Sequence, residues 1–165
     1  MKAAVDPDEL VVGIDASVLI DLVEGKVLAG LNELFPAVAV PALVKKEIRR
    51  GVANHPVNKG ILRSAWLFSV AAEDPDDLQL IADLHSGWGS VPPNNAGEAE
   101  LIALCRRYGW IGLLEDIQAR RTAHREEVHA VRLSTCAIAG AALGVITADH
   151  RCALLGPPDT ARDHC

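Results

Sequence analysis

The chain contains Leu10-Val11-Val12-Gly13-Ile14-Asp15, an unbroken apolar run that ends in a carboxylate. A short run of this kind is typical of a strand buried on both faces, as in a parallel sheet. A second such run, Trp110-Ile111-Gly112-Leu113-Leu114, is followed by Glu115 and Asp116. Open α/β folds build their sites beyond the carboxyl ends of parallel strands. We therefore expect Asp15 and Asp116 to lie at the same edge of one sheet.

Strand-like and helix-like segments alternate along the rest of the chain. Apolar patterns predict strands at residues 10–14, 37–40, 66–71, 110–114 and 128–131. Periodicity and capping signals predict helices at residues 18–23, 26–34, 41–50, 74–85, 96–108, 117–125 and 135–143, with a loop or short helix at 54–60. This order predicts a three-layer α/β/α fold with a mainly parallel central sheet. We expect one domain over residues 10–155, between a flexible N-terminal tail (1–9) and a C-terminal tail (156–165).

Two further carboxylates lie on the apolar faces of predicted helices. Glu47 shares a face with Leu43 and Val44, and Glu98 shares one with Ile102. An unpaired buried carboxylate is costly, so each of these two groups needs a partner. Hard divalent cations are bound by clustered oxygen ligands. One metal site shared with the two strand-end aspartates would give all four carboxylates a partner.

Each of the four carboxylates also has a structural alternative. Asp15 and Asp116 each precede a predicted helix and are alternatively plain helix caps. Glu47 is alternatively a surface residue among basic neighbours. Glu98 follows Asn95 at the spacing of a capping box, in which the glutamate reaches back to the cap residue. A capping role is compatible with metal binding.

Composition limits the classes of function. The chain has 165 residues, of which 50% are hydrophobic and 4% aromatic, and its formal net charge is −6. An acidic chain is not an obvious nucleic-acid binder, so such binding must rely on metal or on a local basic patch. Arg120 and Arg121, with Arg106, Arg107 and Arg125, form a candidate patch for phosphate contacts. A solvated helix face, or one that contacts protein, is the alternative.

The cysteines and the apolar runs indicate in which cellular compartment the protein is expected. Cys105, Cys136, Cys152 and Cys165 show no paired spacing, which favours small apolar residues in a reducing cytosol over disulfides or zinc. The first residues turn acidic too soon for a signal peptide. The apolar run at residues 136–148 is too short to span a bilayer. We expect a cytoplasmic protein without a membrane segment.

Four segments, in this order, resemble the motifs of the PIN-domain family of metal-dependent ribonucleases. They are VGIDASVLI (12–20), PALVKKEI (41–48), GEAELIAL (97–104) and LLEDIQARR (113–121). The resemblance covers roughly residues 10–148, although the segment from Arg49 to Asn95 carries no diagnostic residues. Gly97-Glu98-Ala99-Glu100 is similar to the third motif of small prokaryotic PIN proteins that are often encoded as toxins with an antitoxin.

The resemblance implies a PIN-like fold and an endoribonuclease that hydrolyses RNA phosphodiester bonds. It implies that one or two Mg²⁺ or Mn²⁺ ions are held by Asp15, Glu47, Glu98 and Asp116. The implied partners are an RNA substrate, a possible protein antitoxin and a second copy of the chain. The predicted helices within residues 19–31 carry more apolar side chains than one helix stripe needs to cover a sheet edge, and such surplus apolar surface also favours a homodimer. The apolar side chains are those of Leu19, Ile20, Val23, Val27, Leu28 and Leu31.

Several neighbouring residues take secondary roles. Ser17 either caps the following helix or supports Asp15 or a metal-bound water through a hydrogen bond. Glu115 is a supporting residue, and Glu100 is expected to face solvent or to lie behind the ligands. Asp21 is close enough in sequence to join the acidic group. The segment VITADH (145–150) resembles a strand followed by Thr-x-Asp in many PIN toxins, but it comes after a complete set of carboxylates.

Two other functions are compatible with these residues. One is a PIN-like module with weak catalysis that works in binding or assembly. The other is an unrelated α/β metal phosphohydrolase. Phosphatases of the haloacid-dehalogenase type need Asp-x-Asp after the first strand, and Asp15-Ala16-Ser17 lacks the second aspartate.

Overall fold

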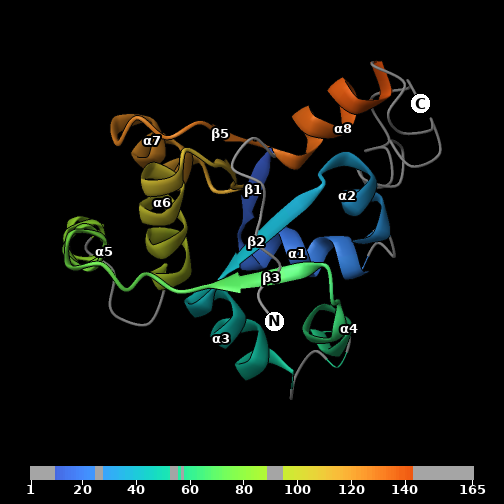
Figure 1. Cartoon of the computed structure of the whole chain (residues 1–165), viewed down its shortest axis with the longest axis horizontal. Helices are drawn as coiled ribbons and strands as arrows, with labels where there is room; N and C mark the ends of the chain where they lie inside the picture. Colours follow the sequence, from blue (N-terminus) through green and yellow to red (C-terminus); the bar gives the residue numbers. More distant parts are fainter. Residues whose placement is uncertain (1–9, 25–27, 53–55, 57, 89–94, 143–165) are drawn as a thin grey trace.

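A parallel sheet forms the centre of the molecule (Figure 1). The computed structural model describes residues 10–24, 28–52, 56, 58–88 and 95–142. Its strands are β1 (Val11–Ile14), β2 (Ala37–Pro41), β3 (Leu67–Val70), β4 (Ile111–Leu113) and β5 (Ala130–Val131). They are ordered β3-β2-β1-β4-β5, and all paired neighbours are parallel. Since β2 and β3 extend the sheet to one side of β1 while β4 and β5 extend it to the other, the order reverses between β1 and β4.

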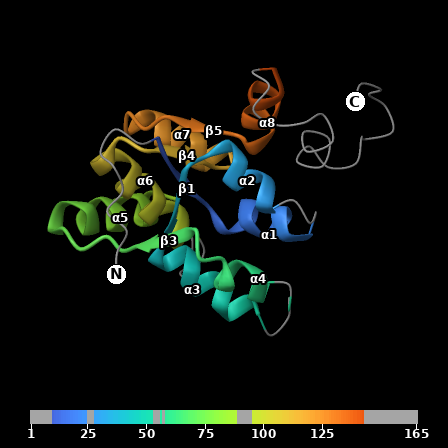
Figure 2. The same cartoon turned by 45° about the vertical axis from the view of Figure 1, so that its right-hand side comes forward.

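Helices cover both faces of the sheet (Figure 2). They are α1 (Ala16–Glu24), α2 (Leu28–Leu34), α3 (Ala42–Gly51), α4 (Asn58–Arg63), α5 (Pro75–Gly87), α6 (Ala96–Tyr108), α7 (Ile117–Arg125) and α8 (Leu133–Ala142). Val12 and Ile14 of β1 share one apolar cluster with residues of α1 to α4 and α8. A second cluster joins α5, α6 and α7. The predicted three-layer α/β/α fold with a parallel sheet is thereby confirmed.

A glycine in β1 lets α6 pack close to the sheet. Gly13 of β1 pairs with Gly112 of β4 across the point where the strand order reverses. A Cβ atom added at Gly13 would lie 2.5 Å from Leu101 Cδ1 and 3.1 Å from Cys105 Sγ. A side chain at this position would therefore have to displace the Leu101 side chain or move α6 away from β1. The close approach matters for the site because α6 carries Glu98 and β1 leads into Asp15.

Most boundaries differ from the sequence prediction by only a few residues. The predicted helices at residues 96–108 and 117–125 have the observed bounds of α6 and α7. Gly109 ends α6 in the left-handed conformation, with φ of 68°, and donates its N–H to the carbonyl of Cys105. The start of α1 was predicted wrongly, because Leu19 N–H already bonds to the carbonyl of Asp15. Ser17 therefore lies inside the helix and does not cap it.

Some predicted boundaries at the edges of the fold differ from the observed ones, and other predicted segments lie outside the described residues. The edge strands β3 and β5 are shorter than predicted, α5 runs on to Gly87, and α8 begins at Leu133. The predicted tails at residues 1–9 and 156–165, and the segment at 145–150, lie outside the described residues.

The structure describes two of the four cysteines, and it shows the length and apolar character of the described helices. Cys105 is buried, Cys136 is partly buried, and both are free thiols. Cys152 and Cys165 fall outside the described part of the chain. Of the helices that the structure describes, none has the length and apolar character needed to cross a membrane.

Candidate active site

Asp15 lies where the strand order reverses. It follows β1 directly, and its main-chain N–H donates to the carbonyl of Leu113 on β4 (3.3 Å). Its side chain is only 5% exposed. Oδ2 accepts hydrogen bonds from the Ser17 main-chain N–H (3.3 Å) and from Ser17 Oγ (2.7 Å). The carboxylate therefore caps α1 and is also held at the position where open α/β sheets bind ligands.

Glu47 reaches the same region from α3. Its side chain is half-buried, and Oε1 accepts a hydrogen bond from the Gly97 N–H (3.2 Å). A Cβ atom at Gly97 would lie 2.8 Å from Val44 Cγ2 and 3.0 Å from Glu47 Oε2, so α3 packs tightly on the first turn of α6. Burial raises the pKa of Glu47, and the charge of Asp15 adds to this rise. Glu47 is therefore not a free surface residue.

Glu98 reaches the same region from the first turn of α6 and is half-buried. Burial, followed by the like charges of Asp15, Asp116 and Glu47, raises the pKa of Glu98 to about 7. The capping-box alternative is not realised, because Asn95 adopts a left-handed conformation and its side chain makes no capping hydrogen bond. The structure therefore brings Glu98 into one electrostatic neighbourhood with the other three carboxylates.

Asp116 is the most exposed member of the group. Its Oδ1 accepts a hydrogen bond from the Ala119 N–H (2.7 Å), which makes it the N-cap of α7. The capping alternative is thus realised here. Capping occupies one carboxylate oxygen, and the charge of Asp116 still raises the pKa of Glu98. The same residue can therefore cap a helix and bind a cation.

A divalent cation needs several oxygen ligands around one position. In their present rotamers, no three or more His, Cys, Asp or Glu side chains of the described residues are grouped closely enough to hold a metal ion. Each of Asp15, Glu47 and Asp116 instead accepts a nearby hydrogen bond. Four carboxylates with no histidine or cysteine among them suit Mg²⁺ or Mn²⁺ better than Zn²⁺. A cation between them would also relieve the repulsion felt at Glu98, so these residues fit such an ion.

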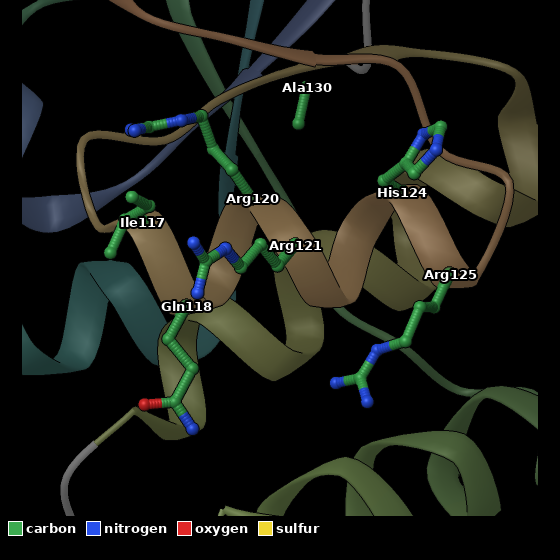
Figure 3. A pocket seen from close by; sticks show the side chains of 7 residues that line it. All are labelled: Ile117, Gln118, Arg120, Arg121, His124, Arg125 and Ala130. Carbon is green, nitrogen blue, oxygen red and sulfur yellow. The ribbon is translucent and has the colours of Figure 1, made fainter.

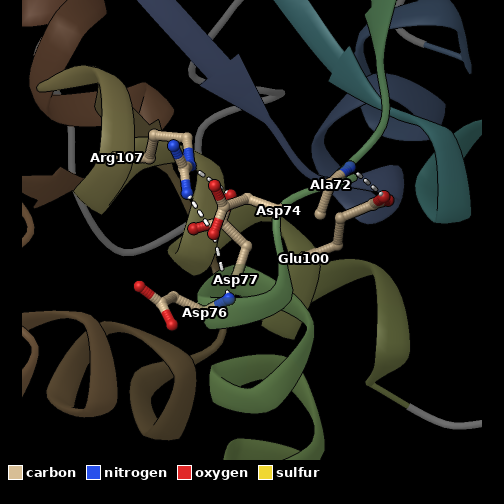
Figure 4. A network of polar contacts seen from close by, with 6 residues as sticks. All are labelled: Ala72, Asp74, Asp76, Asp77, Glu100 and Arg107. Atoms are coloured by element: carbon tan, nitrogen blue, oxygen red, sulfur yellow. Dashed lines mark hydrogen bonds and ion pairs between the residues drawn. The ribbon is translucent and has the colours of Figure 1, made fainter.

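Glu100 has a role that the sequence did not reveal. We expected it to face solvent or to lie behind the ligands, and its exposed fraction of only 4% excludes the first of these alternatives. Oε2 accepts a hydrogen bond from the Leu43 N–H (2.6 Å), and Oε1 accepts one from the Ala72 N–H (3.2 Å; Figure 4). Glu100 thereby joins α6 to the first turn of α3 and to the segment after β3. A signal was present, because apolar residues flank Glu100 on both sides in a helix that covers the sheet.

Glu115 and Asp21 lie outside the group around Glu98. Glu115 Oε1 accepts a hydrogen bond from the Leu133 N–H (2.9 Å), and Oε2 forms an ion pair with Arg132 (3.6 Å). Glu115 therefore fixes the start of α8. Asp21 is largely exposed, and partial burial of its carboxyl group, followed by the charges of Glu24 and Glu115, raises its pKa.

Part of the candidate basic patch is engaged in internal contacts. Arg107 forms ion pairs with Asp74 (2.6 Å) and Asp77, which tie α6 to the start of α5 (Figure 4). Arg106 pairs with Glu126 at 3.1 Å. Arg120 Nη1 donates to the carbonyls of Leu114 (2.9 Å) and Glu115 (2.5 Å), at the end of β4. These three arginines support the fold, and the outward cations of the patch are on α7.

Titration of Glu98 makes the stability of the metal-free protein depend on pH. The ordinary pKa is 4.5 and the folded value is about 7, so the folded state binds the extra proton between these values. The free energy of unfolding should therefore fall as the pH rises from about 5 to about 8. Thermal melts in EDTA across this range measure the fall. Glu98→Gln should show a smaller fall than the parent, and parallel curves for the two proteins would contradict the assignment.

Most of this chain matches a known protein family. A family model described as a PIN domain matches residues 11–148. The match includes all five strands and all four carboxylates described above. The search of curated proteins found no match.

Proposed function

The chain belongs to the PIN-domain family, and from this membership we propose that it is an endoribonuclease that hydrolyses RNA phosphodiester bonds with Mg²⁺ or Mn²⁺. PIN domains are generally hydrolytic nucleases that use divalent metal ions. The observation that carries the proposal is the convergence of like charges on Glu98 from two strand ends and a neighbouring helix. A polyanionic substrate cannot approach such a group unless cations neutralise it.

Four residues would hold the ions: Asp15, Glu47, Glu98 and Asp116. Bound ions would polarise the phosphoryl group, lower the pKa of a water molecule and stabilise the leaving oxygen. The chain itself fixes where the carboxylates lie. Ser17 orients Asp15, the Gly97 N–H orients Glu47, and the Ala119 N–H orients Asp116. Glu100 sets the position of α3 against α6, and hence of Glu47 against Glu98.

Cleavage of varied labelled RNAs in Mg²⁺, Mn²⁺ or EDTA tests this function. We expect products with either metal and none in EDTA. Metal should also raise the melting temperature, because a ligand at about 100 times its Kd adds about 2.7 kcal/mol to the free energy of unfolding. The exposed Asp76 on α5 gives a matched control, since Asp76→Asn should change neither result. Cleavage that persists in EDTA, or no metal-dependent shift together with no cleavage, would contradict the proposal.

The biological role that we propose is that of a toxin in a cytoplasmic toxin–antitoxin pair. The Gly97-Glu98-Ala99-Glu100 motif supports the toxin role. The free thiols of Cys105 and Cys136 support a reducing compartment such as the cytoplasm. Induced expression of the parent should arrest growth, whereas Asp15→Asn should not. Co-expression of a small protein encoded beside the gene should relieve the arrest. Normal growth under strong induction of an RNA-cleaving parent would contradict the toxin role.

A homodimer is also proposed, although its apolar surface is smaller than the sequence suggested. Leu19 and Leu31 are fully buried within the chain, while Ile20, Val23 and Leu28 pack against the same core. Val27 lies outside the described residues. Sedimentation at micromolar concentration measures the association. We expect a dimer, and a monomer of 17.6 kDa at every concentration would exclude it.

A further inference from the structure

A hollow of about 670 Å³ lies along the outer face of α7 (Figure 3). Its lining includes Gln118, Arg121, His124 and Arg125 from α7, and none of its lining residues is an aspartate or glutamate. Ile117, at the start of the helix, lines the same hollow and is 55% exposed. The surface is therefore basic, with an apolar side chain at one end, on a chain whose net charge is −6.

Within the part of the chain that the structure describes, the two outer arginines of this hollow, Arg121 and Arg125, form no ion pair. Among the described residues, the arginines in ion pairs are Arg106, Arg107 and Arg132. Arg125 Nη2 donates to Thr122 Oγ1 (2.9 Å), one turn back on the same helix, and its side chain projects away from the ribbon of α7 in Figure 3. Arg121 is exposed and points outward in Figure 3. Both guanidinium groups are thus available to an external anion, and neither would have to break an ion pair to bind it.

The hollow begins beside a candidate metal ligand. Asp116 caps α7, and the next residue, Ile117, already belongs to the lining. At about 1.5 Å of rise per residue, Arg121 and Arg125 lie about 8 Å and about 14 Å along the helix from Asp116. The two cations therefore lie at increasing distances along the axis of α7 from Asp116, on the side of the helix that lines the hollow. An anion that contacts both is extended and carries repeated negative charges.

We propose that the hollow on α7 binds the ribose-phosphate backbone of single-stranded RNA next to the bond that is cleaved. Arg121 and Arg125 contact successive parts of that backbone through charge-assisted hydrogen bonds. The exposed Ile117 offers an apolar surface to a sugar or base. The proposal rests on the proposed ribonuclease function for its orientation, with one phosphate at the carboxylates and its neighbours along α7. The position of the hollow next to Asp116 favours RNA over an acidic protein segment as its occupant.

RNA binding without cleavage tests the proposal. Fluorescence anisotropy of a labelled single-stranded RNA in EDTA gives the affinity of the parent and of Arg121→Ala/Arg125→Ala. Loss of two phosphate contacts should reduce the slope of log affinity against log salt by about 1.4, at about 0.7 per contact for single strands. The affinity advantage of the parent should therefore shrink about sevenfold between about 50 and 200 mM salt. Arg121→Lys/Arg125→Lys keeps both charges and should retain most of the slope.

A double variant elsewhere controls for general electrostatics. Lys59→Ala/Arg63→Ala removes the same charge from the exposed side chains of α4, far from α7 in Figure 1. The proposal predicts a smaller change in slope for this control. An equal change, or unchanged RNA affinity in the α7 variant, would overturn it. Unchanged RNA affinity with loss of a protein partner would assign the surface to protein instead.

A small substrate distinguishes RNA binding on α7 from phosphodiester hydrolysis at the carboxylates. Bis(p-nitrophenyl) phosphate reaches the carboxylates without occupying α7. With Mn²⁺, its hydrolysis by Arg121→Ala/Arg125→Ala should equal that of the parent, while the KM for RNA rises. Equal loss of both activities would show damage to the metal group and would overturn a role limited to binding. If the parent hydrolyses neither substrate, the ribonuclease function fails, while the anisotropy result still decides whether α7 binds RNA.

Discussion

Replacing Asp15 by asparagine should reduce RNA cleavage by about 100-fold or more, because loss of residues that only support metal ligands already costs about 10- to 100-fold. The change removes one negative charge and keeps the shape of the side chain. Asparagine caps helices as well as aspartate does, and it can still accept the hydrogen bond from Ser17. The melting temperature in EDTA should therefore stay close to that of the parent. Single-turnover cleavage in Mn²⁺ measures the loss.

The matched variant Asp76→Asn should cleave at the parental rate, because Asp76 is exposed on α5. In Asp15→Asn, the increase in melting temperature caused by metal should also shrink, since one ligand is missing. Parental cleavage by a well-folded Asp15→Asn protein would remove Asp15 from the site. Loss of cleavage with an unchanged response to metal would place its role in another step.

Replacing Glu100 by alanine should lower the free energy of unfolding by about 2–4 kcal/mol, because it leaves two backbone donors without their acceptor at about 1–3 kcal/mol each. These donors are the N–H groups of Leu43 and Ala72. Ala72 is only partly buried, so water can replace part of that loss. Denaturant titration at neutral pH in EDTA measures the change.

Glutamine at the same position separates shape from charge. Glu100→Gln keeps one acceptor oxygen and places an amide NH₂ group opposite the second N–H donor, so its loss should lie between those of alanine and the parent. Glu126→Ala removes a glutamate from an ion pair with the exposed Arg106 and should cost only about 0–1 kcal/mol. If Glu100→Ala were no more costly than Glu126→Ala, Glu100 would not connect α6 to α3.

The fold could be predicted because its signals are local. Unbroken apolar runs specify β1 and β4, while Gly109 and Asp116 supply the signals that end α6 and begin α7. Edge strands were predicted less well, since β3 and β5 contact the core on fewer sides and their patterns are weaker. The start of α8 depends on Glu115, which is distant in sequence from Leu133.

The candidate site was only partly predictable. The strand-end aspartates follow from the pattern of a parallel sheet, and Glu47 and Glu98 stand out as carboxylates on apolar helix faces. The contacts that orient them depend on how α3, α5 and α6 meet, which no local pattern encodes. Glu100 and the Arg107–Asp74–Asp77 ion pairs belong to that class. Their residue types are ordinary for solvated helix faces, and only the packing gives them partners.

The strand order also determines at which stage of synthesis and folding the carboxylates can come together. Asp15 and Asp116 are 101 positions apart, and they become neighbours only after β4 has paired with β1. Such long-range parallel pairing closes a large loop and tends to form late in folding. A growing polypeptide that ends before α6 contains Asp15 and Glu47 but neither of the other two carboxylates. If RNA cleavage needs all four carboxylates, as proposed, an unfinished or prematurely terminated chain should leave intact the RNA from which it is being translated.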